Sequence, residues 1–272
     1  MTQNTFTRHL AIYQAQFKIW TAVQVQYRVA MIIWLIGIII EPVVYLVVWS
    51  NVAAASGGSV GGFDRAGFAA YFIGAMVVNH LTFCWHMWEY DYIIRQGQLS
   101  ARLLRPMHPI HADLAENMAY KVITSVVVVP TTIVLVLIFQ PVWQPQTVQL
   151  LAFVPALVMA FLIQFFMGWA LAMAAFWTTR ISAINRIYFL GKLFLAGQLS
   201  PLALLPEWLQ TAASISPFRW MISFPVELLL GRVEGTAVYT GLLAQLAWVT
   251  LGVLAVRMIW RAGVRRYSAF GS

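Results

Sequence analysis

The sequence predicts an all-α membrane protein with six membrane-crossing helices, and two observations lead to this prediction. First, 61% of the 272 residues are hydrophobic and only 10% are charged, whereas a soluble domain carries about 25% charged residues. One water-soluble core of this size cannot bury that much apolar surface, so lipid must solvate part of it. Second, six segments approach the ~20 apolar residues that cross a bilayer core as a helix.

Loops and polar breaks separate the six predicted spans. Gly and Ser residues at 56–59 end the first span, and Gln140-Pro141 closes the third. The fourth is long enough to tilt or to bend at Pro155, and polar residues interrupt the fifth. In chain order, the predicted spans are residues 29–48, 68–87, 122–139, 148–177, 181–199 and 238–259.

Basic residues predict the orientation. The net charge is +8, but the basic residues are scattered singly between apolar runs, so we expect no nucleic-acid partner. With a cytoplasmic N-terminus, the outer side holds only Arg65, Arg219 and Arg232, and Lys192 lies within a span. Basic residues favour the cytoplasmic side, which predicts an inner-membrane protein with both termini inside. The 13 inner residues are Arg8, Lys18, Arg28, Arg95, Arg102, Arg105, Lys121, Arg180, Arg186, Arg257, Arg261, Arg265 and Arg266.

Residues 1–28 precede the predicted permeation unit of residues 29–265, and residues 266–272 form a cytoplasmic tail. Because residues 1–28 lack a continuous apolar run and a small-residue cleavage site, we expect no cleavable signal. Residues 5–27 repeat apolar side chains at spacings of four and three, which predicts a helix lying in the inner membrane interface. The alternative is a solvated helix. The apolar side chains are Phe6, Leu10, Tyr13, Phe17 and Trp20.

The cytoplasmic loop of residues 89–117 is much longer than a connector needs to be. Gly97 breaks the chain before a short helical stretch over residues 99–104, which Pro106 and Pro109 are expected to end. A loop with its own helix predicts a docking surface for a cytoplasmic partner, and the alternative is a plain loop.

Residues 201–220 are apolar but are interrupted by Pro201, Pro206 and Pro217. The stretch between the last two prolines is too short to span a membrane. Its position after the fifth span places it outside, where a re-entrant or interface-lying hairpin is expected.

Enzyme motifs are missing from the sequence. There is no phosphate-binding loop, because Gly191-Lys192 is followed by Leu193, and there is no G-x-S-x-G, H-E-x-x-H or C-x-x-C motif. We therefore expect no catalytic, metal or cofactor site in this chain. The neighbouring His108, His111 and Asp113 favour a turn over a metal site. His80, Cys84 and His86 offer too few ligands on one face for a metal and are expected to make polar contacts between helices.

Two ionisable residues lie within predicted spans, where charges are costly and usually face the protein interior. Glu41, followed by Pro42, is past the middle of the first span, and Lys192 is near the middle of the fifth. They are candidates for the lining of a transport path or for a pair that bridges two helices. The alternatives are a local contact of Glu41 at a proline kink and a lysine that reaches toward the membrane surface.

Taken together, these segments resemble a type-two permease of the ABC exporters. An interfacial helix precedes six spans, with a long loop after the second span and an outer re-entrant segment after the fifth. The local matches resemble the bacterial subgroup that is often encoded as unlike permease pairs beside an ATPase. They are GQLSARLLRP (97–106), QLSP (198–201), LPEWL (205–209), SPFRW (216–220) and PVELLLG (225–231).

The resemblance implies that residues 98–105 are a coupling helix that inserts into an ATPase subunit. Its contact residues would be Gln98, Leu99, Arg102, Leu103, Leu104 and Arg105. Two permeases, identical or unlike, would pair with two ATPase subunits that hold ATP and magnesium, and the path would form between the permeases. Residues 202–216 would act as an outer gate, with Pro206, Trp208 and Pro217 as its marked residues.

The cargo expected from the resemblance is a small amphiphilic or hydrophobic compound, including cationic drugs. Export of a lipid or lipid-linked glycan by the same architecture is an alternative. An ATP-independent secondary transporter would need an inverted repeat, and the first three spans contain no counterpart to residues 201–220. A membrane enzyme would need an interfacial cluster of acids and histidines, and the nearest candidates lie in the expected coupling loop. They are Glu89, Asp91, His108, His111 and Asp113.

Overall fold

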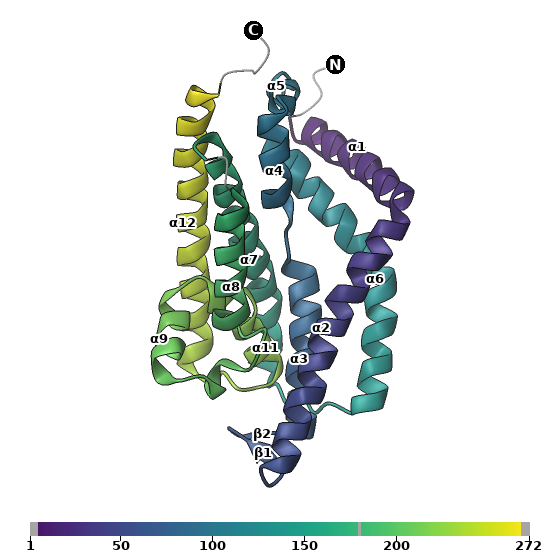
Figure 1. The fold of residues 1–272 in the computed structure, drawn as a ribbon, viewed down its shortest axis with the longest axis vertical. Coiled ribbons are helices and arrows are strands. Elements are labelled where there is room, and N and C mark those ends of the chain that lie inside the picture. The colour runs from purple at the N-terminus through teal and green to yellow at the C-terminus, as the bar shows by residue number, and fades with distance from the viewer. Residues whose placement is uncertain (1–4, 179–180, 268–272) are drawn as a thin grey trace.

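The computed structural model describes residues 5–178 and 181–267. They form an elongated bundle of helices with one short β-hairpin at its lower end in Figure 1, which also shows α5 at the opposite end. We call these the hairpin end and the α5 end. The long helices are α1 (Thr5–Gln26), α2 (Arg28–Ala55), α3 (Arg65–Thr82), α6 (Pro109–Phe139), α7 (Thr147–Ala172), α8 (Ile181–Leu195) and α12 (Thr236–Arg266).

Shorter elements connect the long helices. The hairpin pairs β1 (Ser59–Val60) with β2 (Phe63–Asp64) in antiparallel register. At the α5 end, α4 (His86–Arg95) and α5 (Gln98–Leu103) follow α3, and the 3₁₀ turn η1 (Met173–Phe176) ends α7. Between α8 and α12 lie η2 (Leu202–Leu204), α9 (Glu207–Ile215), α10 (Phe218–Met221) and α11 (Ser223–Leu229).

Five helical segments in the described ranges are long and apolar enough to cross a membrane. They correspond to α2, α3 with α4, α6, α7 with η1, and α12. The predicted fifth span corresponds to α8, whose 15 residues extend about 22 Å at 1.5 Å per residue. That is less than the ~30 Å of a bilayer core.

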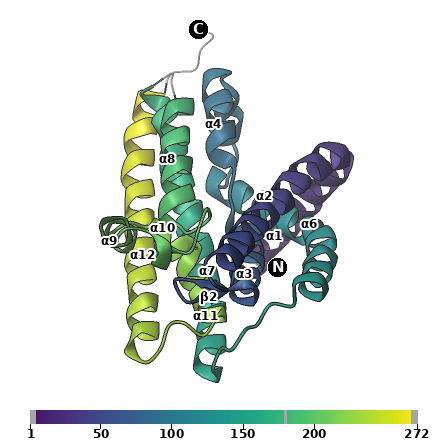
Figure 2. The same cartoon turned by 60° about the horizontal axis from the view of Figure 1, so that its bottom comes forward.

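The segment formed by α3 and α4 is the centre of the fold. In its most apolar window 72% of the residues are buried, against 11% for α2. Figure 2 shows α1, α2 and α6 on one side of it and α7, α8 and α12 on the other. The large apolar residues of α2 and α6 that remain exposed, such as Trp34 and Val126, are suited to contact with lipid.

Two boundaries differ from the sequence prediction. The predicted span over residues 68–87 is interrupted, because α3 ends at Thr82 and α4 begins at His86. Pro109 begins α6 instead of ending a helix, so most of the predicted loop is helical. The first position of a helix suits proline, because its missing N–H would have no partner there, and His108 caps this start through its side chain.

The close packing of α12 against η1 depends on a glycine. A Cβ atom at Gly263 would overlap the ring of Phe176. A small residue therefore allows the helix to approach the end of α7, as is common where membrane helices pack. Toward the hairpin end, the buried Gln245 of α12 donates to the carbonyls of Ala156 and Trp220, at 3.0 and 2.8 Å.

Candidate functional site

The short helix α5 is the candidate contact surface, and it begins at a glycine in the left-handed conformation. Gly97 has φ of 70°, which a residue with a side chain adopts only at a cost. The turn at Gly97 folds α5 across the end of α4. One side of α5 then faces the bundle, where Leu99 is fully buried.

Asp113 of α6 anchors α5. The guanidinium of Arg102 donates to one oxygen of this carboxylate at 2.9 Å. The Tyr90 hydroxyl and the Trp169 indole donate to the other oxygen, at 2.6 and 2.8 Å. Burial alone would lower the pKa of Arg102, but Asp113, Tyr90 and Glu116 raise it. Arg102 therefore stays charged and holds α5 through a charge-assisted contact.

A second contact joins α5 to the end of α12. The Ser100 hydroxyl lies 2.9 Å from the Tyr267 hydroxyl, and either can donate. Beside this contact, the ring of His108 packs on Trp169 and Trp260, with ring centroids 5.5 and 4.6 Å apart. The inner side of α5 is thus held by Asp113 of α6 and by Tyr267 at the end of α12.

The outer side of α5 is free in the described structure. Leu104 is 87% exposed, and Gln98, Leu103 and Arg105 are exposed as well. Of the six predicted contact residues, these four face away from the bundle, whereas Leu99 and Arg102 face into it. An apolar and basic tip on a fixed base can enter a groove of another protein.

A polar cluster surrounds the break between α3 and α4. Lys121 of α6 donates to the Phe83 carbonyl at 2.7 Å, which supplies a partner for a carbonyl left at the end of α3. Lys192 of α8 donates to Gln164 and Asn79 at 2.7 and 3.0 Å. The described ion pairs are Arg95–Asp91, Arg102–Asp113 and Arg219–Glu227, and they include neither lysine.

The two predicted path residues do not pair with each other. Lys192 is only 1% exposed, so it lines no open path in this conformation. Glu41 is exposed on α2, and its carboxylate accepts a hydrogen bond from Tyr45 at 3.3 Å.

The three predicted gate residues lie in the bent segment between α8 and α11. Pro206 precedes α9, Pro217 precedes α10, and Trp208 is 69% exposed. An ion pair from Arg219 to Glu227, at 2.9 Å, fastens α10 to α11. Next to it, a surface groove of about 430 Å³ runs along α9.

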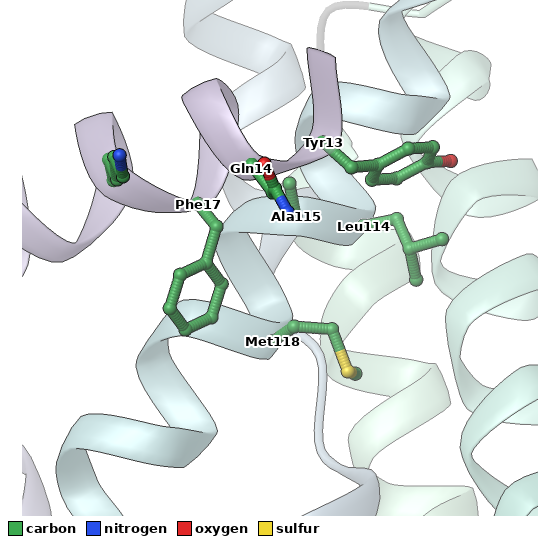
Figure 3. Close-up of a pocket in the computed structure, with 7 residues that line it drawn as sticks. Tyr13, Gln14, Phe17, Leu114, Ala115 and Met118 are labelled. Atoms are coloured by element: carbon green, nitrogen blue, oxygen red, sulfur yellow. The ribbon is translucent and has the colours of Figure 1, made fainter. Parts of the chain in front are cut away.

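A wider groove lies between α1 and α6. It has a volume of about 650 Å³ and is lined mostly by apolar side chains. In Figure 3, the labelled lining residues Tyr13, Gln14 and Phe17 come from α1, and Leu114, Ala115 and Met118 come from the facing α6. Tyr13 closes its end through a hydrogen bond with His111 at 2.5 Å. Two residues of the apolar face predicted for α1, Tyr13 and Phe17, thus line this groove together with Gln14 and Lys18.

Sequence reasoning missed the residues that hold these parts together. From the sequence, Asp113 is a candidate only for a metal site or an enzyme site, and the sequence predicts no individual role for Trp169, Gln164 or Glu227. The sequence contains one weak signal for Asp113, because this acidic residue lies less than three helical turns before the predicted span of residues 122–139. In the described residues no group of three or more His, Cys, Asp or Glu side chains is placed to hold a metal ion.

No curated protein and no solved structure matches the chain. Residues 35–271, however, match the family described as ABC-2 family transporter protein. The match covers most of the chain, including α5 and the segment between α8 and α12. Membrane subunits of this family have no ATPase domain of their own and typically bind no cofactor, which implies a separate ATPase partner. The chain is therefore a multi-pass membrane protein that belongs to the ABC-2 transporter family.

Proposed function

We propose that this chain is the transmembrane subunit of an ATP-driven exporter in a bacterial inner membrane. The observation that carries the proposal is α5. Its inner side is fixed by Leu99 and by the Arg102–Asp113 ion pair, while Leu103, Leu104 and Arg105 are exposed at the end of the bundle. A subunit without an ATPase domain needs such a tip to receive the force of a separate motor.

The α5 end faces the cytoplasm in this proposal. Support comes from the charges, because Arg95, Arg105 and the arginines at the end of α12 lie at this end, whereas Arg65 and Arg232 lie toward the hairpin end. Arg180, also expected inside, falls outside the described residues. Basic residues favour the cytoplasmic side. α8 is then a sixth crossing, short for a bilayer, that the adjoining segment of residues 196–206 completes.

The working complex contains two permeases, identical or unlike, and two ATPase subunits that carry ATP and magnesium. α8 supports a permease partner, because Ile187, Leu190 and Phe194 are exposed at spacings of three and four. Such a row forms one apolar helix face. Packed near a second permease, it would give the transport path an apolar wall.

An apolar wall favours a small amphiphilic or hydrophobic cargo. Cationic cargo is disfavoured on any route past the α3–α4 break, because the amino groups of Lys121 and Lys192 lie there and neither has a carboxylate partner among the described ion pairs. A lipid or lipid-linked glycan is the second candidate.

α9, with Pro206, Trp208 and Pro217, serves as the outer gate and enters the outer leaflet.

Co-purification tests the proposal. The tagged chain, purified from the membranes of its own host, should bring down a subunit that hydrolyses ATP. Leu104→Asp should lower the amount recovered about tenfold, as expected for an interface anchor. Val142→Asp is the matched control, since Val142 is 53% exposed in the loop between α6 and α7 at the far end. Equal recovery with both variants would refute docking at α5.

A further inference from the structure

Asp113 joins four elements at one buried carboxylate. It belongs to α6, and its three donors come from α4, α5 and α7: Tyr90, Arg102 and Trp169. The residue is only 1% exposed. Asp113 therefore cannot touch an ATPase itself, although it holds the helix that is proposed to do so.

The chain connections of α5 are a glycine on one side and a turn on the other. On one side it is joined to α4 through Gly97, whose backbone is the least restricted of any residue. On the other side, residues 104–108 form a turn before α6. A force on α5 could therefore swing it about these two joints. The contacts that oppose this are the Arg102–Asp113 ion pair, the Ser100–Tyr267 contact and the burial of Leu99.

Two of the elements that meet at Asp113, α4 and α7, also border the polar cluster in the bundle. α4 begins directly after the break that contains Cys84. α7 carries Gln164, which lies just over one turn from Trp169 and contacts both Thr82 and Lys192. A displacement that reaches α4 and α7 together would therefore move both sides of the break.

We propose that Asp113 is the positioning residue that makes α5, α4, α6 and α7 move as one unit, so that a push on α5 reaches the α3–α4 break. The inference rests on the proposed docking of an ATPase at α5. Docking of the ATPase and transmission of its movement are then separable. Leu103, Leu104 and Arg105 make the contact, and Asp113 passes the movement on.

The chain's single cysteine provides a reporter for this movement. Cys84 lies in the break and is only 2% exposed, so N-ethylmaleimide should label it slowly at rest. In the purified complex with its ATPase, trapping with ATP and orthovanadate should change the labelling rate of the wild-type chain by about fivefold, a typical strength of coupling between sites.

Asp113→Asn should abolish that change while the ATPase still co-purifies in wild-type amounts. Asp91→Asn is the matched control, because it removes the same charge from the half-exposed Arg95–Asp91 pair on α4. It should keep the full response. Should Asp113→Asn fail to fold, Trp169→Phe removes the α7 donor while keeping an aromatic ring in the same place, and it should reduce the response.

The possible results separate the inference from the proposed function. If no ATPase binds the wild-type chain, the proposed function is wrong. If the ATPase binds but Cys84 never responds to ATP, or if Asp113→Asn and Trp169→Phe respond like wild type, transmission through Asp113 is overturned and docking stands. A purely structural role would alter folding or ATPase recovery together with the labelling.

Discussion

Lys192 of α8 donates a hydrogen bond of 2.7 Å to the side-chain oxygen of Gln164 on α7, inside the bundle. The lysine also donates to Asn79 and lies over the ring of Phe83, 5.1 Å from its centroid. Burying an amino group is costly unless it is hydrogen-bonded, and these contacts offset that cost. They also connect α8 to both α3 and α7, so Lys192 has a structural role whether or not it meets cargo.

Lys192→Met should lower the free energy of unfolding by about 2 kcal/mol, because it removes the donor to the buried Gln164 oxygen and to the half-buried Asn79 oxygen. Adding Gln164→Leu removes one of those acceptors and should recover about half of the loss. Thermal unfolding in detergent measures both effects. Glu41→Gln is the control and should change stability by less than about 0.5 kcal/mol, as exposed substitutions usually do. Equal losses for Lys192→Met and Glu41→Gln would contradict the structural role.

Gly97→Ala should lower ATP hydrolysis by the purified complex more than it lowers the stability of the fold. Gly97 has a positive φ, and alanine there costs about 1 kcal/mol, which should shift α5 from its seat. ATP hydrolysis by the purified complex measures the effect. Gly37→Ala on α2 is the control, because an added Cβ would meet no atom within 4 Å. If ATP hydrolysis is as fast with Gly97→Ala as with Gly37→Ala, the turn before α5 is not needed.

The parts of this fold that could be predicted depend on local pattern. The long apolar helices follow from runs of apolar residues, α1 follows from its spacing of three and four, and α5 follows from Gly97 and the prolines after it. Pro109 starts a helix where the sequence predicts the end of one, because proline both stops helices and starts them.

The break at residues 83–85 could not be predicted, because Phe83-Cys84-Trp85 contains neither glycine nor proline. What favours the break is Lys121, a residue 38 positions away that donates to the Phe83 carbonyl. The role of Asp113 was hidden for the same reason. Its three donors come from three other elements, and only the folded chain brings them together.

The start of α6 should become less stable as the pH falls. The Nδ1 atom of His108 accepts a hydrogen bond from the Ile110 amide at 3.3 Å, which only the neutral ring can do. Burial, and then the nearby His111, lower the pKa of His108 below its ordinary value of 6.5. Because the unfolded chain binds the proton more readily, the cap's contribution is complete above pH 6.5 and is lost as the pH falls through the lowered pKa.

His108→Asn tests this, since asparagine caps a helix without titrating. Between about pH 8 and about pH 5, wild type should lose ~1 kcal/mol more stability than His108→Asn, which is what a cap contributes. The midpoint of thermal unfolding should therefore fall further for wild type. Any loss of ring packing in the variant is the same at each pH and cancels. Parallel pH curves for the two proteins would rule out a role for His108 protonation.

At the hairpin end, Glu227→Gln should loosen the segment that contains α9 and α10. Glu227 accepts from Arg219 at 2.9 Å and from Ser223 at 2.8 Å. Losing its charge weakens the contact that fastens α10 to α11, by about 1 kcal/mol for a partly exposed pair. Amide hydrogen exchange should then become faster in α9 and α10, about fivefold for that free energy, and stay unchanged in α5.

Glu207→Gln, on α9 and outside the described ion pairs, is the control, since it removes a nearby charge without touching Glu227. Faster exchange in α5 as well would mean that the two ends are tightly coupled at rest, and the outer segment would then not be an independent gate.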